Sequence, residues 1–141
     1  MAADISTDRA AIARYLRSAK TVAIIGLSAD ATKASYGVAQ YLQRNGYKII
    51  PVSPVLKGPV LGETPYASLA DIPSNVKIDI IDVFRRAADM PDAAAQALAR
   101  PAPLFWMQLG ISNPESAAKL MAAGFDVIQD RCIKIEHASL A

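Results

Sequence analysis

The stretch TVAII, residues 21–25, is an almost continuous apolar run that ends at Gly26. A short run of this kind, bounded by glycine, is typical of a strand buried on both faces of a parallel sheet. Segments with helical spacing separate it from four similar runs, at residues 47–52, 78–83, 104–107 and 125–129. This alternation predicts an α/β domain with a three-layer Rossmann-like fold and a mostly parallel sheet of five or six strands.

Residues that commonly begin or end helices mark the predicted helices. The first helix follows Thr7 or Asp8, either of which can accept a hydrogen bond as its N-cap. A second helix, at residues 36–44, has Ser35 as its expected N-cap and ends at Gly46, where we expect a left-handed turn.

Two further helices follow the apolar runs at residues 78–83 and 104–107. Asp89 and Pro91 open one that reaches about Arg100. Asn113 caps the other, which ends at Gly124. No element is predicted for residues 130–141.

A connection rich in proline and glycine spans residues 53–69. It is long for a plain loop, so it is a candidate binding segment. We expect it to contain a short additional strand near Val60.

Size and composition exclude several classes of protein. The 141 residues fit one domain, residues 1–141, with a sizeable core. The net charge of +2 comes from scattered Lys and Arg, which argues against a nucleic-acid surface. No apolar run approaches the roughly 20 residues that span a bilayer, and the N-terminal segment lacks a signal-peptide pattern. We therefore expect a cytoplasmic protein without a membrane or nucleic-acid partner.

The chain has one cysteine, Cys132, and one histidine, His137. No intramolecular disulfide can form, and a zinc site with several thiolates is excluded, so we expect no metal site. His137 lies far from any strand exit, which weakens a Ser–His–Asp triad. Asp79 and Asp82 are interpreted as structural or exposed, not as a catalytic pair. No catalytic residue is assigned.

The segment after the first strand has features of a phosphate site, because parallel sheets bind ligands beyond the carboxyl ends of their strands. Glycine allows a sharp turn there, and the next helix presents unpaired N–H groups near its first residues. The candidate residues are Gly26, Ser28, Lys33, Ser35, Tyr36 and Gly37. The alternative is that Gly26 only turns the chain and Ser35 only caps a helix. Two glycines this far apart are not the three-glycine dinucleotide fingerprint.

The end of the second strand lacks the acid that binds the ribose 2′-hydroxyl in NAD-binding domains of this plan. Ser53 and Pro54 stand there instead, and Lys57 follows. These residues suit an adenosine with an extra phosphate on its ribose, as in NADP and coenzyme A. Arg85 and Arg86 follow the apolar run at residues 78–83. Arg85 is placed to face such a ligand, whereas Arg86 fits a solvated surface.

The segment WMQLG, residues 106–110, contains two further residues to assign to the core or the cleft. Trp106 is interpreted as a core residue. Gln108 stands at the carboxyl edge of its strand and is a candidate to project its amide into the cleft.

Five stretches follow one another in a specific order and spacing: VAIIGLSADATKASYGVAQYLQRNGYKIIPVSP, LGETPYASLADIP, IDIIDVFRR, FWMQLGI and AAGFDVIQDRCIKIEH. In these stretches the chain resembles the small stand-alone CoA-binding domain proteins of bacteria. That family is similar to the CoA-binding domain of succinyl-CoA synthetase α-subunits and acyl-CoA synthetases. The resemblance extends from about Ala10 to His137.

The resemblance implies a Rossmann-like fold that binds coenzyme A, and it assigns three groups of residues. The pyrophosphate would be held by Gly26, Leu27, Ser28, Ser35, Tyr36 and Gly37. The adenosine part would be held by Val52, Ser53, Pro54 and Lys57. The cleft would also be lined by Val83, Phe84 and Arg85. The family often has asparagine where this chain has Ser53, which shortens the polar side chain.

The sequence therefore predicts a protein that binds CoA or an acyl-CoA, without catalysis of its own, since the ligase apparatus of the larger relatives is absent. The alternative is a small NADP-binding oxidoreductase or nucleotide sensor. A third possibility is a partner protein that CoA only stabilises. Cys132 is expected to be an inert core thiol, and the alternative is a mixed disulfide with the CoA thiol under oxidising conditions.

Overall fold

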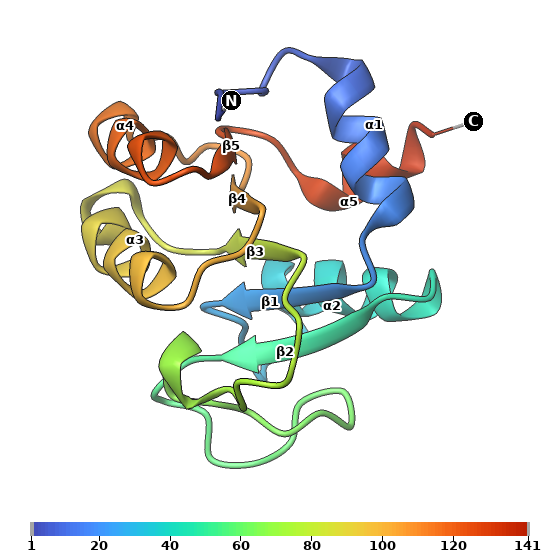
Figure 1. The fold of residues 1–141 in the computed structure, drawn as a ribbon. Coiled ribbons are helices and arrows are strands. Elements are labelled where there is room, and N and C mark those ends of the chain that lie inside the picture. The colour runs from blue at the N-terminus through green and yellow to red at the C-terminus, as the bar shows by residue number, and fades with distance from the viewer. Residues whose placement is uncertain (1, 141) are drawn as a thin grey trace.

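Five parallel strands form the centre of the computed structural model, which describes residues 2–140 (Figure 1). They are β1 (Thr21–Ile25), β2 (Lys48–Val52), β3 (Ile80–Val83), β4 (Leu104–Met107) and β5 (Asp126–Ile128). Their order is β2-β1-β3-β4-β5, and every neighbouring pair is parallel. The chain runs outward from β1 to β2 and then returns to the other side of β1. The predicted Rossmann-like fold is confirmed.

The expectation of an additional strand near Val60 is wrong. Val60 and Glu63 form only an isolated antiparallel bridge, with N–H to O distances of 3.0 and 2.9 Å. Between them Leu61 and Gly62 both have positive φ, 52° and 78°. The chain therefore reverses within two residues, which leaves no extended segment to pair with the sheet.

Helices cover both faces of the sheet (Figure 1). On one face lie α1 (Arg9–Ser18), α2 (Ala34–Arg44) and α5 (Ile133–Ala138), whose buried residues share an apolar cluster with Val22, Ile24 and Trp106. On the other lie α3 (Met90–Ala99) and α4 (Pro114–Ala122), packed on Ala23 and Ile25. Two 3-10 turns, η1 (Leu69–Asp71) and η2 (Ala87–Asp89), precede β3 and α3. In the part of the chain described, no helix combines the length and apolar composition needed to cross a membrane.

Two of the predicted caps are confirmed and one is wrong. The Asp8 carboxylate accepts the Ala11 N–H at 3.0 Å, and the Asn113 side chain accepts the Ser116 N–H at 3.0 Å. Ser35 does not cap α2, because the helix begins one residue earlier, at Ala34. Ser35 instead lies buried in the first helical turn.

Helix α5 is the α-helix that the sequence did not predict. It has six residues, and Ile133 is its only buried one, so it has no helical repeat of apolar positions. A tertiary contact fixes its start: the Gln108 side-chain oxygen accepts the Ile133 N–H at 3.2 Å. The expectation that Gln108 projects into the cleft is wrong, since the residue is buried against α5.

The exits of β1, β2 and β3 meet at Gly26. The Gly26 N–H donates to the Val52 carbonyl at 2.8 Å. The segment after β3 approaches so closely that a Cβ on Gly26 would lie 2.3 Å from the Phe84 carbonyl oxygen. The φ of Gly26 is +86°, a conformation that other residues rarely adopt. Only glycine satisfies both conditions, so this residue fixes how the three strand exits are arranged.

Replacing Gly26 with alanine should lower the free energy of unfolding by about 2–5 kcal/mol, because the left-handed backbone and the contact with Phe84 both become strained. The matched control is Gly37→Ala. Gly37 lies inside α2, and a Cβ there meets nothing within 4 Å, so this change should stabilise by about 0.5–1 kcal/mol. Urea unfolding measures both. Equal midpoints for the two variants would contradict the close approach at Gly26.

Candidate functional site

A cleft opens at the carboxyl edge of the sheet, where strand order reverses between β1 and β3. It encloses about 410 Å³ and is lined by three segments that follow β1, β2 and β3. The lining residues are Gly26, Leu27, Ser28, Ala29, Asp30, Ser53, Val55, Leu56, Phe84 and Arg85. In open parallel sheets this is the position where ligands bind.

The structure brings six of the predicted ligand-binding residues to the lining of this cleft, whereas Ser35, Tyr36 and Gly37 lie in α2 outside the lining. Those that line it are Gly26, Leu27, Ser28, Ser53, Phe84 and Arg85. Val52 and Val83 end their strands with side chains buried toward α3 and α4, so they support the cleft from beneath. Lys33, Pro54 and Lys57 are exposed outside its lining.

The loop between β1 and α2 is folded by its own side chains. The Ser28 N–H donates to the Ser35 hydroxyl oxygen at 3.0 Å, and the Asp30 N–H donates to that of Ser28 at 3.0 Å. The Thr32 N–H donates to the Asp30 carboxylate at 2.9 Å. The Thr32 hydroxyl donates to the same carboxylate at 2.7 Å. These hydrogen bonds from the Thr32 hydroxyl and N–H, together with the charge of Lys33, lower the pKa of Asp30. Ser35 therefore joins the loop to α2 without being its cap.

The free N–H groups of α2 lie at different residues from those expected. The Tyr36 and Gly37 N–H groups, expected to be unpaired, donate to the Lys33 carbonyl at 3.2 and 3.3 Å. The residues that begin the helix are Ala34 and Ser35, and N–H groups in this position have no acceptor within their own helix. The end of α2 with N–H groups left unpaired by the helix is thus formed by Ala34 and Ser35.

One cation belongs to the cleft. Arg85 is half-buried and lines it, with Nε 3.4 Å from the position of a Cβ on Gly26. Its neighbour Arg86 is 83% exposed and pairs with the Asp89 carboxylate at 3.1 Å. Arg85 is therefore available to a ligand, whereas Arg86 belongs to the surface.

The exit of β2 forms the opposite wall of the cleft. Ser53 is buried, and its N–H donates to the Tyr66 carbonyl at 2.9 Å. Val55 is 77% exposed and Leu56 is half-buried, and both line the cleft. These apolar residues, like Ala29 and Asp30, were not predicted. The only feature of the sequence that could have pointed to them is that they stand next to predicted binding residues.

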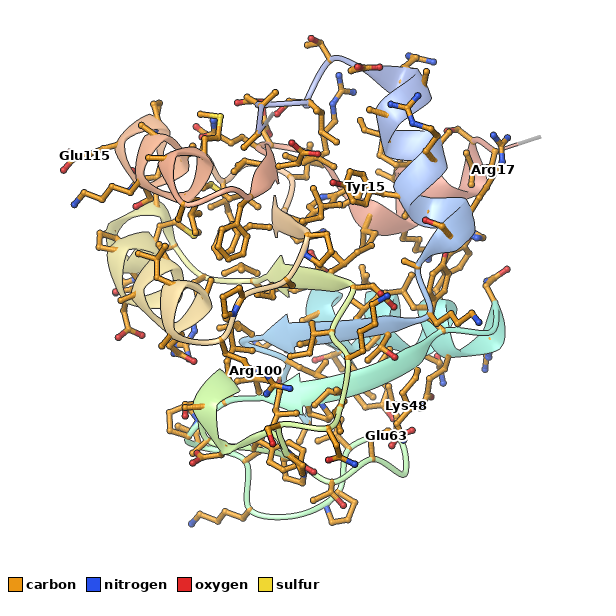
Figure 2. All side chains as sticks on the ribbon, viewed as in Figure 1. Tyr15, Arg17, Lys48, Glu63, Arg100 and Glu115 are labelled. Atoms are coloured by element: carbon orange, nitrogen blue, oxygen red, sulfur yellow. The ribbon has the colours of Figure 1, made fainter. Side chains whose placement is uncertain are left out.

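Two other hollows lie away from the strand exits. One, between β2 and residues 63–76, is flanked by the Lys48–Glu63 ion pair of 2.6 Å (Figure 2). The other lies beside α1, where the Tyr15 hydroxyl donates to the Asp126 carboxylate at 2.5 Å (Figure 2). In the first hollow, Lys48 and Glu63 pair with each other. In the second, the Asp8 and Asp126 carboxylates accept hydrogen bonds, whereas the Arg14 side chain has no ion pair within residues 2–140. Neither hollow lies at the strand exits, where ligands of parallel sheets bind.

The remaining candidates for chemistry do not converge on the cleft. The His137 ring lies 2.7 Å from the Tyr41 hydroxyl, on the layer formed by α2 and α5. Cys132 is half-buried just before α5, and Trp106 is buried with its indole N–H donating to the Arg131 carbonyl at 2.8 Å. Among residues 2–140, no group of three or more His, Cys, Asp or Glu side chains is placed to hold a metal ion.

Asp82 is a fully buried carboxyl group in the sheet. It lies in register with Ile24 and Trp106, on the face covered by α2 and α5. Neither carboxyl oxygen has a hydrogen-bond partner in the part of the chain that the structure describes. Burial raises the pKa of Asp82 well above its ordinary value, and the nearby Val83 N–H, which is not in hydrogen-bonding geometry, only partly opposes this shift. Asp79, by contrast, accepts the N–H groups of Lys20 and Thr21 at 2.9 and 3.0 Å.

A protein-family model described as a CoA binding domain matches residues 20–138. The uncharacterized protein YneT of Bacillus subtilis is 39% identical over 130 residues, which are 92% of this chain and 94% of YneT. The matched segment contains all three walls of the cleft.

Solved structures share the same fold. The cell-free ID.343 protein of Thermus thermophilus has a TM-score of 0.89 and 36% identity, over 94% of this chain and 98% of that protein. A hypothetical protein from Pyrococcus horikoshii OT3 has a TM-score of 0.88 and 31% identity, over 94% of this chain and 91% of that protein. The similarity therefore extends over nearly the whole length of each.

The contribution of Asp82 to the stability of the protein should fall as pH rises above about 4. The unfolded chain releases the Asp82 proton near the ordinary pKa of 3.8, whereas the folded protein retains it to higher pH. The unfolding free energy should decrease by at most about 1.4 kcal/mol per pH unit through this group. Asp82→Asn, which cannot ionise, should flatten that slope in urea titrations between pH 4 and 8.

The same substitution at Asp79 is the control. Asp79→Asn replaces a charged acceptor of two N–H groups with a neutral one, and should lower stability by about 1 kcal/mol at pH 7. Parallel pH profiles for Asp82→Asn and the wild type would refute the assignment of a buried, protonated Asp82.

Proposed function

The chain belongs to the CoA binding domain family, and we propose that its strand-exit cleft holds coenzyme A or an acyl-CoA through the pyrophosphate and the 3′-phosphoadenosine. The observation that carries this proposal is the composition of the cleft together with the N-terminus of α2, whose first residues follow the loop that lines the cleft but do not line it themselves. A glycine turn, a helix N-terminus and one available arginine stand at the β1 and β3 exits, while the β2 exit has no acid.

The pyrophosphate is assigned to the loop after β1. The Ala34 and Ser35 N–H groups and the positive end of the α2 dipole favour an anion there. The Ser35 hydroxyl oxygen accepts the Ser28 N–H, so its own O–H proton is free to donate to a phosphate oxygen. Arg85 supplies the charge-assisted hydrogen bonds.

The adenosine is assigned to the exit of β2. Val55 and Leu56 give the base an apolar surface, and Ser53 and Pro54 add no negative charge that would repel a ribose phosphate. Lys57 is exposed three residues beyond Pro54 and is assigned to the 3′-phosphate. The proposal is for binding without catalysis, and it names no reacting side chain.

Titration calorimetry with CoA, dephospho-CoA, NADH and NADPH tests this function. We expect CoA to bind and dephospho-CoA to bind about tenfold or more weakly, because one charged contact is lost. Equal affinity for both would remove the 3′-phosphate contact from the proposal. Tighter binding of NADPH than of CoA would favour the alternative, a small NADP-binding oxidoreductase or sensor.

The two adjacent arginines provide a matched pair of variants. Arg85→Gln should weaken CoA binding by about tenfold to a hundredfold, the effect of losing a charged hydrogen bond to phosphate. Arg86→Gln should leave affinity within about twofold, since Arg86 is exposed and pairs with Asp89. If Arg86→Gln had the larger effect, the phosphate would lie outside the cleft described here.

A further inference from the structure

Large exposed apolar side chains in residues 2–140 are few, namely Val55, Leu98, Leu109 and Ile135. Val55 follows β2 and Leu109 follows β4, so two of them stand at the carboxyl edge of the sheet. Val55 lines the cleft, whereas Leu109 is 61% exposed beyond its other side. Of the two at this edge, Leu109 is the one that the nucleotide contacts proposed above do not use.

The backbone places Leu109 next to the cleft. The Gln108 N–H donates to the Val83 carbonyl at 3.4 Å, which joins the exit of β4 to that of β3. Phe84 and Arg85, the next residues after β3, line the cleft. A ligand that extends past Arg85 therefore meets the turn that carries Leu109.

This turn holds Leu109 in an outward position. The Ile111 N–H donates to the Gln108 carbonyl at 2.9 Å, and the Gly110 N–H donates to the Asp130 carboxylate at 2.6 Å. The Asp130 N–H donates in return to the Ile111 carbonyl at 3.0 Å. Leu109 is thus fixed on a hydrogen-bonded turn, which reduces the entropy lost when a ligand covers it.

The strand order gives the direction of the ligand. With the adenosine at β2 and the pyrophosphate at β1, the remaining arm can continue only across β3 toward β4, because β2 is the edge of the sheet. From β1 to β4 is two strand spacings, about 10 Å. The extended pantetheine arm of CoA is longer than this, so its sulfur end reaches the Leu109 turn.

We propose that the physiological ligand is an acyl-CoA and that its acyl chain lies on Leu109, with half-buried Ile111 beside it. This proposal rests on the proposed function, since the nucleotide contacts set the direction of the arm. The hydrophobic effect supplies the preference: an acyl chain and Leu109 cover apolar surface that free CoA leaves in water.

Calorimetry with 3′,5′-ADP, CoA, acetyl-CoA, butanoyl-CoA and hexanoyl-CoA tests it. For the wild type, affinity should rise about twofold per added methylene, the effect expected for half-burial. Leu109→Ser should abolish this rise and leave the affinity for 3′,5′-ADP within twofold. Leu109→Ala, with a smaller loss of apolar surface, should retain part of the rise.

Val55→Ser is the matched control, because Val55 is also exposed and apolar but stands at the adenosine end. It should weaken all five ligands by the same factor. The proposal is overturned if wild-type affinity does not depend on acyl length, or if Leu109→Ser keeps the dependence or weakens 3′,5′-ADP. It is also overturned if Val55→Ser removes the dependence. Failure of the proposed function looks different, since 3′,5′-ADP and CoA would then not bind the wild type.

Discussion

The close approach of two backbones at Gly26 is the constraint on which the site depends. Because residue 26 has no side chain, the Phe84 carbonyl can lie where a Cβ would otherwise stand. The same residue bonds to the end of β2 through its N–H. The exits of β1, β2 and β3 are therefore fixed relative to one another by one residue, and the cleft is the space that their following segments enclose. Packing of the core determines where the strands lie in the sheet. The contact at Gly26 determines how the segments that follow β1, β2 and β3 are arranged around the cleft.

The elements that the sequence predicted well are those whose signals are local. Strand β4 is a short apolar run with the predicted bounds, residues 104–107, and Asn113 caps α4 as expected. The errors arise where a tertiary contact or a tight turn decides. Helix α5 begins because Gln108, distant in sequence, accepts its first N–H. The segment near Val60 has residues suited to a strand, but Leu61 and Gly62 turn the chain back at once.

The candidate site was predictable as a set of residues but not as a network. A glycine after a buried strand and a serine before a helix indicate an anion site by local rules. Those rules did not show that Ser35 bonds to Ser28 and not to its own helix, nor that the Tyr36 and Gly37 N–H groups are already paired. Asp82, interpreted from the sequence as structural or exposed, is buried outside the cleft. Within an apolar strand, sequence alone cannot tell an exposed acid from a buried one, because only the register with Ile24 and Trp106 places it beneath helices.

The distinction between CoA and NADP depends on the β4 side of the cleft, because both ligands carry a pyrophosphate and a phosphorylated adenosine. The second half of NADP is a ribose and a nicotinamide, whose hydroxyl and amide groups require hydrogen-bond partners. At the β4 exit, the Gln108 oxygen is occupied by Ile133, the Gly110 N–H by Asp130 and the Ile111 N–H by the Gln108 carbonyl. These occupied groups would leave the hydroxyl and amide groups of a nicotinamide riboside without enough hydrogen-bond partners. The pantetheine arm of an acyl-CoA also carries amide and hydroxyl groups, but its terminal alkyl chain needs no hydrogen-bond partner. On the path proposed above, that terminal chain is the part that covers Leu109. The proposal of an acyl-CoA over NADP therefore rests on the end of the ligand that reaches the β4 exit.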